Sequence, residues 1–500
     1  MLFNSIDFLI FFPIVAIVYF LIPRKVKYIW LLFASYYFYM CWNAKYALLI
    51  ATSTIITYLA GIFIEKAKKT SLKKWIVALS FVSNLSILFL FKYFNFMVDT
   101  LNKVLTRVHI NPLSVSLDLL LPVGISFYTF QALGYTIDVY RGNTKAEKNP
   151  LMYALFVSFF PQLVAGPIER SGNLLNQLRS IAVKKEGEGY FTCNINNISS
   201  GFTMMIWGLF MKMVIADRIA IYVDSVYSSL YKMGTVETVL AAIGFSIQIY
   251  CDFAGYSSIA IGAARVMNFN LMENFNTPYF ATSISDFWKR WHISLSTWFR
   301  DYLYIPLGGN RKGRFRQYLN LMITFLVSGL WHGASWHFVI WGGIHGFYQI
   351  IGHITKPARE KLCKLFKVNT EVFSFRFGQM LITFCLTSFA WIFFKAGSIN
   401  QVKEFLSRMF GNFNPWVLFD DSLYLNGLDI KESNILIVAV LILLVVDLVR
   451  YKKKEDIGAV LLKQNLWFRW AVLILLIVAV IVFGEYGINF DSQKFIYFDF

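Results

Sequence analysis

Long apolar stretches recur along the whole chain, and they limit its fold more than any other feature of the sequence. A helix needs about 20 apolar residues to cross the ~30 Å hydrocarbon core of a bilayer. Eleven stretches are clear candidates: 7–22, 28–43, 46–64, 75–97, 200–222, 236–262, 317–331, 335–353, 376–395, 434–449 and 466–484. Two more, 115–139 and 151–168, are broken by proline or glycine. The sequence therefore predicts an all-α, multi-pass integral membrane protein with eleven to thirteen membrane elements.

The broken stretch at 151–168 contains Pro161, Gly166 and Pro167. Such residues are tolerated at membrane depth only where surrounding protein or water satisfies the freed backbone groups. We therefore expect them in a buried, re-entrant element.

The composition supports a membrane protein. Hydrophobic residues make up 57% of the chain and charged residues 15%, whereas an average soluble domain carries about 25% charged residues. A soluble globule this apolar could not cover its surface with polar groups. Because we find no internal repeat and no low-complexity linker, we expect one domain over 1–500. Its core at 115–353 would carry the chemistry, and 376–484 would supply C-terminal transmembrane helices.

The basic residues favour membrane loops over nucleic-acid binding. The net charge is +18, but the Lys and Arg residues fall between apolar stretches, as expected of cytoplasmic loops. The loops at 24–27, 66–74, 356–367 and 452–454 are basic, and the loop at 397–433 has few basic residues. This pattern predicts that both termini lie outside and the basic loops in the cytoplasm. The five cysteines (Cys41, Cys193, Cys251, Cys363 and Cys385) are scattered and predict neither a disulfide framework nor a metal pair.

Polar and ionisable residues are concentrated at 250–346, in a region whose other residues are apolar enough for a membrane segment. Ionisable residues at membrane depth are costly and usually mark function. In the stretch 285–302, apolar residues stand at 287, 291, 295, 298 and 302. This is helical spacing, and it predicts an amphipathic interfacial helix. An ordinary interfacial belt of Trp and Arg is the alternative.

Four of the six histidines (His292, His332, His337 and His345) lie between 292 and 345. Histidine is the side chain best suited to take and return a proton near neutral pH. His337 and His345, like His353, are individually expected to be packing histidines. We expect no metal site, because no HExxH and no cysteine cluster is present and His332 and His337 would lie about 140° apart on a helix. No G-x-S-x-G motif supports a serine hydrolase.

Three motifs carry a resemblance to a known family: Trp288–Ser296, Trp298–Tyr302 and Trp331-His332-Gly333. Together they resemble the membrane-bound O-acyltransferase superfamily. Pro306–Arg311, Pro161–Ile168 and Phe3-Asn4-Ser5 are similar to its bacterial alginate O-acetyltransferase branch in particular. The teichoic-acid D-alanyl branch is similar at both histidine motifs but typically has a longer insert where Pro306–Gly313 stands. The resemblance implies a ring of helices around a central funnel and tunnel.

The resemblance also implies site residues and a reaction. The essential histidine falls on His332 and a second site residue on His292. The implied reaction moves an acyl group from a cytoplasmic donor to a hydroxyl, with acetyl-CoA as substrate and no bound cofactor. Residues expected to bind donor or substrate are Lys289, Arg290, Arg300, Asp301 and Trp331.

The acceptor and the partners stay open. Alginate, cellulose and peptidoglycan are candidate acceptors, reached through an extracellular or periplasmic acetyl acceptor such as an SGNH-type transferase, near a polysaccharide synthase complex. The lipid bilayer is an expected partner and nucleic acid is not. The alternatives are D-alanyl transfer to teichoic acid, a non-catalytic acyl-group transporter, and a structural scaffold of an export complex.

The basic loops give a testable topology. We expect cysteine labels at Lys69 and Lys453 to react only from the cytoplasm, and a label at Asp421 only from outside, because Lys- and Arg-rich loops are retained inside. Labelling of intact cells with a membrane-impermeant thiol reagent measures this. Opposite accessibility of positions 69 and 453 would refute an even number of spans between them.

Overall fold

The computed structural model describes residues 1–119, 121–164, 166–182 and 194–486. Every regular element in these ranges is a helix, which confirms the predicted all-α class. The chain divides into two compact units: unit 1 contains Met1–Gly201 and Ala260–Met272, and unit 2 contains Phe202–Ile259 and Glu273–Phe500. Cys193 and Ala165 lie outside the described residues. The expectation of one domain over 1–500 stays a prediction.

In the part of the chain that the structure describes, seven helical segments are long and apolar enough to cross a membrane, so the chain is a multi-pass integral membrane protein. They are Ala44–Lys66, Thr70–Arg107, Ile195–Ser228, Thr235–Val266, Phe373–Lys395, Ile430–Lys453 and Leu466–Phe483. The other predicted stretches are also helical, except that 115–139 is helical only from Ile125 and 151–168 only within Pro150–Ser158 and Phe160–Leu163. The total of eleven to thirteen elements and the ring with its funnel and tunnel stay predictions.

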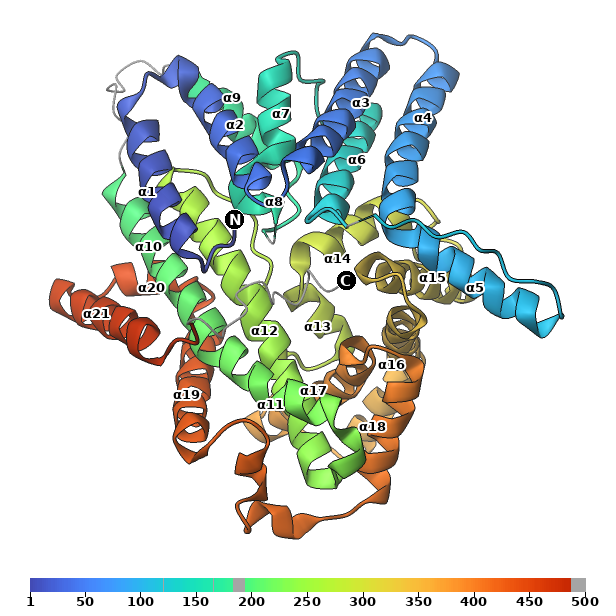
Figure 1. Ribbon diagram of the computed structural model, residues 1–500, viewed down its shortest axis with the longest axis vertical. Coiled ribbons are helices and arrows are strands. Elements are labelled where there is room, and N and C mark those ends of the chain that lie inside the picture. Colours follow the sequence, from blue (N-terminus) through green and yellow to red (C-terminus); the bar gives the residue numbers. More distant parts are fainter. Residues whose placement is uncertain (120, 165, 183–193, 487–500) are drawn as a thin grey trace. The chain divides into compact units, whose positions relative to one another are not determined.

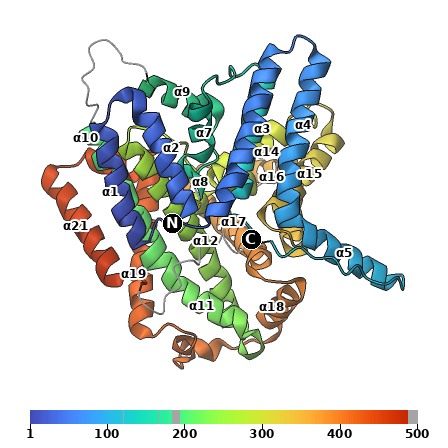
Figure 2. The ribbon, with the colours of Figure 1, turned by 45° about the horizontal axis from the view of Figure 1, so that its top comes forward.

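Unit 1 is built from the first nine helices and parts of two others. They are α1 (Ile6–Leu21), α2 (Arg24–Met40), α3 (Ala47–Lys66), α4 (Thr70–Leu88), α5 (Phe94–Arg107), α6 (Ile125–Arg141), α7 (Pro150–Ser158), α8 (Phe160–Leu163) and α9 (Ser171–Ala182). Helices α10 (Ile195–Leu209) and α12 (Thr235–Val266) contain residues of both units. In Figures 1 and 2, α3, α4 and α6 run side by side and α5 projects beyond the end of α4.

The broken stretch of unit 1 is buried, as predicted. Helix α7 ends at Ser158, and the backbone N–H of Phe160 donates to Ser35 Oγ at 3.1 Å. The carbonyl of Phe156 accepts from the side-chain amides of Gln131 (2.5 Å) and Gln162 (2.7 Å). Side chains thus satisfy the backbone groups that the break releases. Whether this element is re-entrant in a membrane stays a prediction.

Gly166 belongs to the same element and packs against it without space for a side chain. A Cβ at this position would lie 2.3 Å from Gln162 Cα and 2.7 Å from the Pro161 carbonyl oxygen. The backbone therefore folds back on itself at a distance that only glycine permits.

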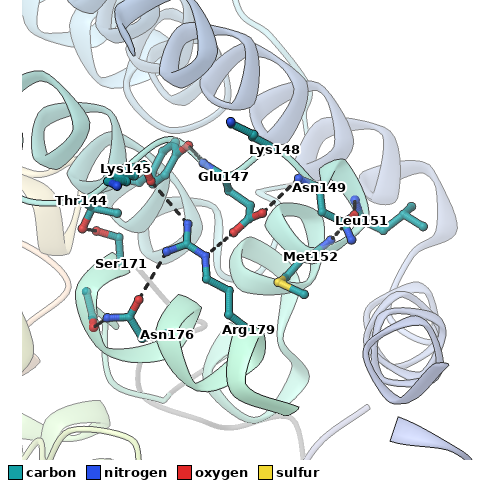
Figure 3. Close-up of polar contacts among 12 residues, drawn as sticks. Thr144, Lys145, Glu147, Lys148, Asn149, Leu151, Met152, Ser171, Asn176 and Arg179 are labelled. Carbon is teal, nitrogen blue, oxygen red and sulfur yellow. Dashed lines mark hydrogen bonds and ion pairs between the residues drawn. The ribbon is translucent and has the colours of Figure 1, made fainter. Parts of the chain in front are cut away.

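An ion pair ties the segment before α7 to α9 within unit 1 (Figure 3). Arg179 Nε lies 2.7 Å from Glu147 Oε2, and Glu147 Oε1 accepts from the Asn149 backbone N–H at 3.0 Å. Asn149 in turn caps the start of α7 by accepting from the N–H groups of Leu151 and Met152. One carboxylate therefore fixes where α7 begins.

Unit 2 contains the remaining helices. Its α-helices are α11 (Asp217–Ser228), α13 (Ile284–Arg290), α14 (Ile293–Phe299), α15 (Arg314–His332), α16 (Trp336–Leu365), α17 (Phe373–Lys395), α18 (Ile399–Gly411), α19 (Ile430–Lys453), α20 (Ile457–Leu462) and α21 (Leu466–Phe483). Short π-helices stand at Phe89–Tyr93 in unit 1 and at Phe210–Ala216 and Arg300–Tyr304 in unit 2. Short 3₁₀ helices stand at Ala44–Tyr46, Leu230–Lys232, Pro278–Phe280, Pro415–Leu418 and Ser422–Leu425.

Helices α15 and α16 pack with their backbones in direct contact. A Cβ on Gly329 would lie 2.2 Å from the Phe338 carbonyl oxygen, and a Cβ on Gly342 would lie 2.2 Å from the Phe325 carbonyl oxygen. Glycines at these two positions let the helices approach this closely. The contact fixes the end of α15, where His332 is the last helical residue.

Candidate active site

The predicted helix across 285–302 is wrong as one continuous element. The structure breaks it at Trp291 and His292 into α13 and α14, and a π-helical turn follows α14. His292 has φ 43° and ψ 53°, the left-handed region. A residue other than glycine pays about 1–3 kcal/mol for such a conformation, and strain of this kind clusters at functional sites.

Asn274 holds the strained turn at His292. Its Oδ1 accepts from Ser294 Oγ at 2.6 Å and lies 3.3 Å from His292 Nδ1, and its backbone carbonyl accepts from the Ile293 N–H at 2.9 Å. Asn274 Nδ2 donates to Ser257 Oγ on α12 at 3.1 Å. The Asn274 side chain therefore connects α12 to His292 and to Ser294 in the first turn of α14.

His292 itself is fully buried and uncharged. The ring of Phe253 packs edge-on against it at 4.7 Å between centroids. Burial lowers the pKa of His292 to about 3, since an apolar surrounding disfavours the charged form. Because a lowered pKa leaves the imidazole deprotonated at every pH above it, His292 stays neutral between pH 5 and 8.

His332 lies in an aromatic cage beside His292. Three rings stand edge-on to it, with centroids at 5.0 Å (Trp331), 5.1 Å (Trp341) and 5.3 Å (Phe394). The centroids of His292 and His332 are 6.4 Å apart, and both side chains are buried. Two histidines separated by 40 positions in the sequence therefore meet in one buried site in unit 2.

The other predicted site residues divide into three groups. Trp331 belongs to the site, since the centroid of its ring lies 6.1 Å from that of His292. Arg290 has two partners in the structure. Its Nε lies 3.0 Å from Asp286 Oδ1, and its Cζ lies 5.5 Å from the centroid of the Tyr451 ring. The remaining three, Lys289, Arg300 and Asp301, are exposed or partly exposed, and Arg300 Nε lies 2.8 Å from Asp301 Oδ1.

His337 and His345 make contacts that favour packing roles. His337 Nδ1 donates to the Phe393 carbonyl at 3.0 Å, and His345 Nδ1 accepts from Trp288 Nε1 at 3.2 Å. His332 ends α15 and His337 lies in α16, so they do not share the helix that the sequence argument assumed. Within the described residues, no three His, Cys, Asp or Glu side chains gather as a metal site would require.

Sequence reasoning missed two parts of this region. Asn274 carried no signal, because a neutral amide between two apolar segments is common. Lys212 did carry one, since a lysine inside the apolar stretch 200–222 needs a partner. Its Nζ lies 2.7 Å from both Asp217 Oδ1 and Asp252 Oδ1. This buried triad joins the π-helix 210–216 to α12.

Fold and site thus define a multi-pass membrane protein with paired buried histidines. A family model for membrane-bound O-acyltransferases matches residues 147–393. The chain is 38% identical over 423 residues to a probable alginate O-acetylase of Azotobacter vinelandii, covering 84% of this chain and 80% of that protein. It is 34% identical over 445 residues to a peptidoglycan O-acetyltransferase of Helicobacter pylori, covering 82% and 80%.

A shorter match, 30% identical over 231 residues, to a teichoic acid D-alanyltransferase of Bacillus subtilis covers 45% of this chain and 56% of that protein. The longer matches span most of both proteins. The chain belongs to the membrane-bound O-acyltransferase family, and it is an O-acyltransferase. The resemblance drawn from its histidine motifs is confirmed.

The low pKa of His292 predicts how its loss affects the pH profile. We expect His292→Gln to lower kcat by roughly 10²-fold, as removal of an oriented polar group does. The acidic limb of kcat/KM between about pH 5 and 8 should keep its midpoint, because a histidine with a pKa of about 3 does not titrate there. Acyl-transfer rates of the purified variant against pH measure this. Loss of the acidic limb would show that His292 titrates in the working range.

Proposed function

We propose that this protein moves an acetyl group from a cytoplasmic thioester, acetyl-CoA, across the membrane to hydroxyls of a cell-surface polysaccharide. The observation that carries the proposal is the pair of buried histidines, His292 and His332, with ring centroids 6.4 Å apart. The relatives named for alginate and peptidoglycan O-acetylation support a polysaccharide as the final acceptor.

His332 acts as the general base in this proposal. It removes the proton of the acceptor hydroxyl while that oxygen attacks the thioester carbonyl carbon. The tetrahedral intermediate then collapses, the carbon–sulfur bond breaks, and His332 returns the proton to the leaving thiolate. Such proton transfer contributes about 10²–10⁴-fold in rate. The aromatic cage supports this role because it excludes water from the site.

His292 orients the acceptor. Asn274 Oδ1 faces His292 Nδ1 at 3.3 Å, and an amide oxygen can only accept, so Nδ1 carries the ring hydrogen. Nε2 of the neutral ring then carries a lone pair and accepts from a second hydroxyl of the acceptor, because the reacting hydroxyl gives its single hydrogen to His332. An oxyanion needs a donor, so this tautomer favours orienting the acceptor over stabilising the oxyanion.

Arg300 and Lys289 are the better candidates for holding the donor's phosphates. Both are exposed, and the pair of Arg300 with the adjacent Asp301 is a surface ion pair of little strength. Arg290 already has Asp286 and Tyr451 as partners, which supports a role in holding α13 in place.

The acetyl group leaves through a partner on the outer side. We place the chain in the bacterial inner membrane with both termini outside, and we propose an SGNH-type transferase or similar periplasmic acetyl acceptor, near a polysaccharide synthase complex, as the next carrier. D-alanyl transfer to teichoic acid is less well supported, since that relative matches 45% of this chain against 84% for the alginate enzyme. A transporter without catalysis is less well supported, since the relatives that match most of the chain are named as O-acetylation enzymes.

The base is tested by His332→Ala. We expect acetylation to fall by at least about 10²-fold, because proton removal is lost, while the protein still inserts and purifies. The measurement is transfer of radiolabelled acetyl from acetyl-CoA by the purified protein in nanodiscs. The control is His353→Ala, which removes an exposed histidine of α16 and should leave the rate unchanged. Wild-type transfer by His332→Ala would contradict the assignment.

Donor binding is tested by Arg300→Gln. We expect a several-fold rise in KM for acetyl-CoA with kcat little changed, and the rise should shrink at high salt because exposed charges are screened. Lys453→Gln, an exposed lysine of α19, is the charge-matched control. An unchanged KM at low ionic strength would remove Arg300 from the donor site. Arg290→Gln should instead reduce thermal stability.

A further inference from the structure

The segment 274–276 supports both helices that flank His292. The Asn274 carbonyl accepts from the Ile293 N–H at the start of α14, and the Asn276 N–H donates to the Arg290 carbonyl at the end of α13, each at 2.9 Å. Between them, the buried ring of Phe275 packs edge-on against Trp291 at 5.0 Å and Phe253 at 4.9 Å. A shift of this segment would therefore move His292.

A charged group on α19 reaches the same segment. Arg450 Nη2 donates to the Phe275 carbonyl at 3.3 Å, and its Nη1 lies 3.8 Å from Asp447 Oδ1. Asp447 Oδ2 accepts from the hydroxyl of Tyr250 on α12 at 2.8 Å. Tyr250, Asp447 and Arg450 thus form a chain from α12 through α19 to the backbone beside Asn274.

Asp447 and Arg450 place charge on α19, although packing alone would need only apolar residues there. The buried residues of α19 are Ala439, Leu443 and Asp447, which are spaced by four and form one stripe. An aspartate on the buried stripe of a membrane helix is costly, and such residues are usually paired and functional. Arg450 and Tyr250 supply the pairing here, and the carbonyl of Phe275 gives the arginine a second partner. The polar residues at the end of this stripe therefore bind the segment 274–276 through the Phe275 carbonyl.

We propose that Asp447 and Arg450 are positioning residues for His292, acting through the 274–276 segment. They lie outside residues 147–393, the part of the chain that the family model matches. The inference rests on the proposed function, in which His292 orients the acceptor. Arg450 does not touch the acetyl group or the acceptor; it holds the backbone that carries Asn274.

A double-mutant cycle between Arg450 and Asn274 tests the proposal. We expect Arg450→Met and Asn274→Ala each to lower kcat about tenfold, as loss of a hydrogen bond to or near a charged group does, with KM for acetyl-CoA changed less than twofold. The double variant should lose less than the product of the two single losses, because Arg450 and the Asn274 side chain act on the same segment. Lys452→Met, an exposed lysine of the same helix, should match the wild type. Rates that multiply in the double variant would overturn the proposal.

Hydrogen exchange gives a second readout that does not need activity. Arg450→Met should speed exchange of the Asn276 and Ile293 amides, while Lys452→Met leaves it unchanged; equal protection in both variants would also overturn the proposal. If Arg450→Met does not purify, Arg450→Lys keeps the cation beside Asp447, loses the planar fork, and enters the same cycle. Wild-type acetylation by His332→Ala would contradict the proposed function, while the exchange result would still decide the positioning role.

Discussion

Every break in an apolar helical protein releases backbone N–H and C=O groups that water cannot reach, and the structure depends on how these groups are satisfied. Side-chain amides recur as the solution. Gln131 and Gln162 bind the carbonyl freed at the end of α7. Asn320 Nδ2 donates to the Gly309 carbonyl at 2.9 Å in the loop before α15. The break at His292 instead uses a backbone group, the Asn274 carbonyl, which accepts from the Ile293 N–H at 2.9 Å. A carboxamide suits this task because it both donates and accepts without carrying a charge that burial would penalise.

The helical elements could be predicted from the sequence because their apolar runs exceed what a soluble chain tolerates. The break at His292 could not. The apolar positions 287, 291, 295 and 298 keep helical spacing across it, and no proline or glycine marks it. Periodicity reports which side of the chain faces apolar surroundings, and the buried positions keep that pattern across the break. What stops the helix is a tertiary contact that no local rule reveals: the backbone of Asn274 and Asn276 bonds to the Ile293 N–H and the Arg290 carbonyl.

The site was predictable in its chemistry but not in its supports. Histidines inside an apolar sequence are conspicuous, so His292 and His332 could be named and the structure brings them together. Buried charges are equally conspicuous, yet their partners are not. Lys212 reaches Asp252 because Gly208 and Gly255 let the two helices touch: a Cβ on either would lie within 2.8 Å of the other's carbonyl oxygen. The sequence shows that burying such a charge is unfavourable, whereas only the packed structure shows which residue pairs with it.

The region that the family model matches does not contain every residue that we propose to hold the active site. That region, residues 147–393, contains both histidines of the site. A support need not lie there, since any helix that presents a donor to the Phe275 carbonyl would hold the same backbone. Arg450 presents that donor from α19. A support on a separate helix holds the geometry of the strained turn at His292 without adding a charged group to the site itself.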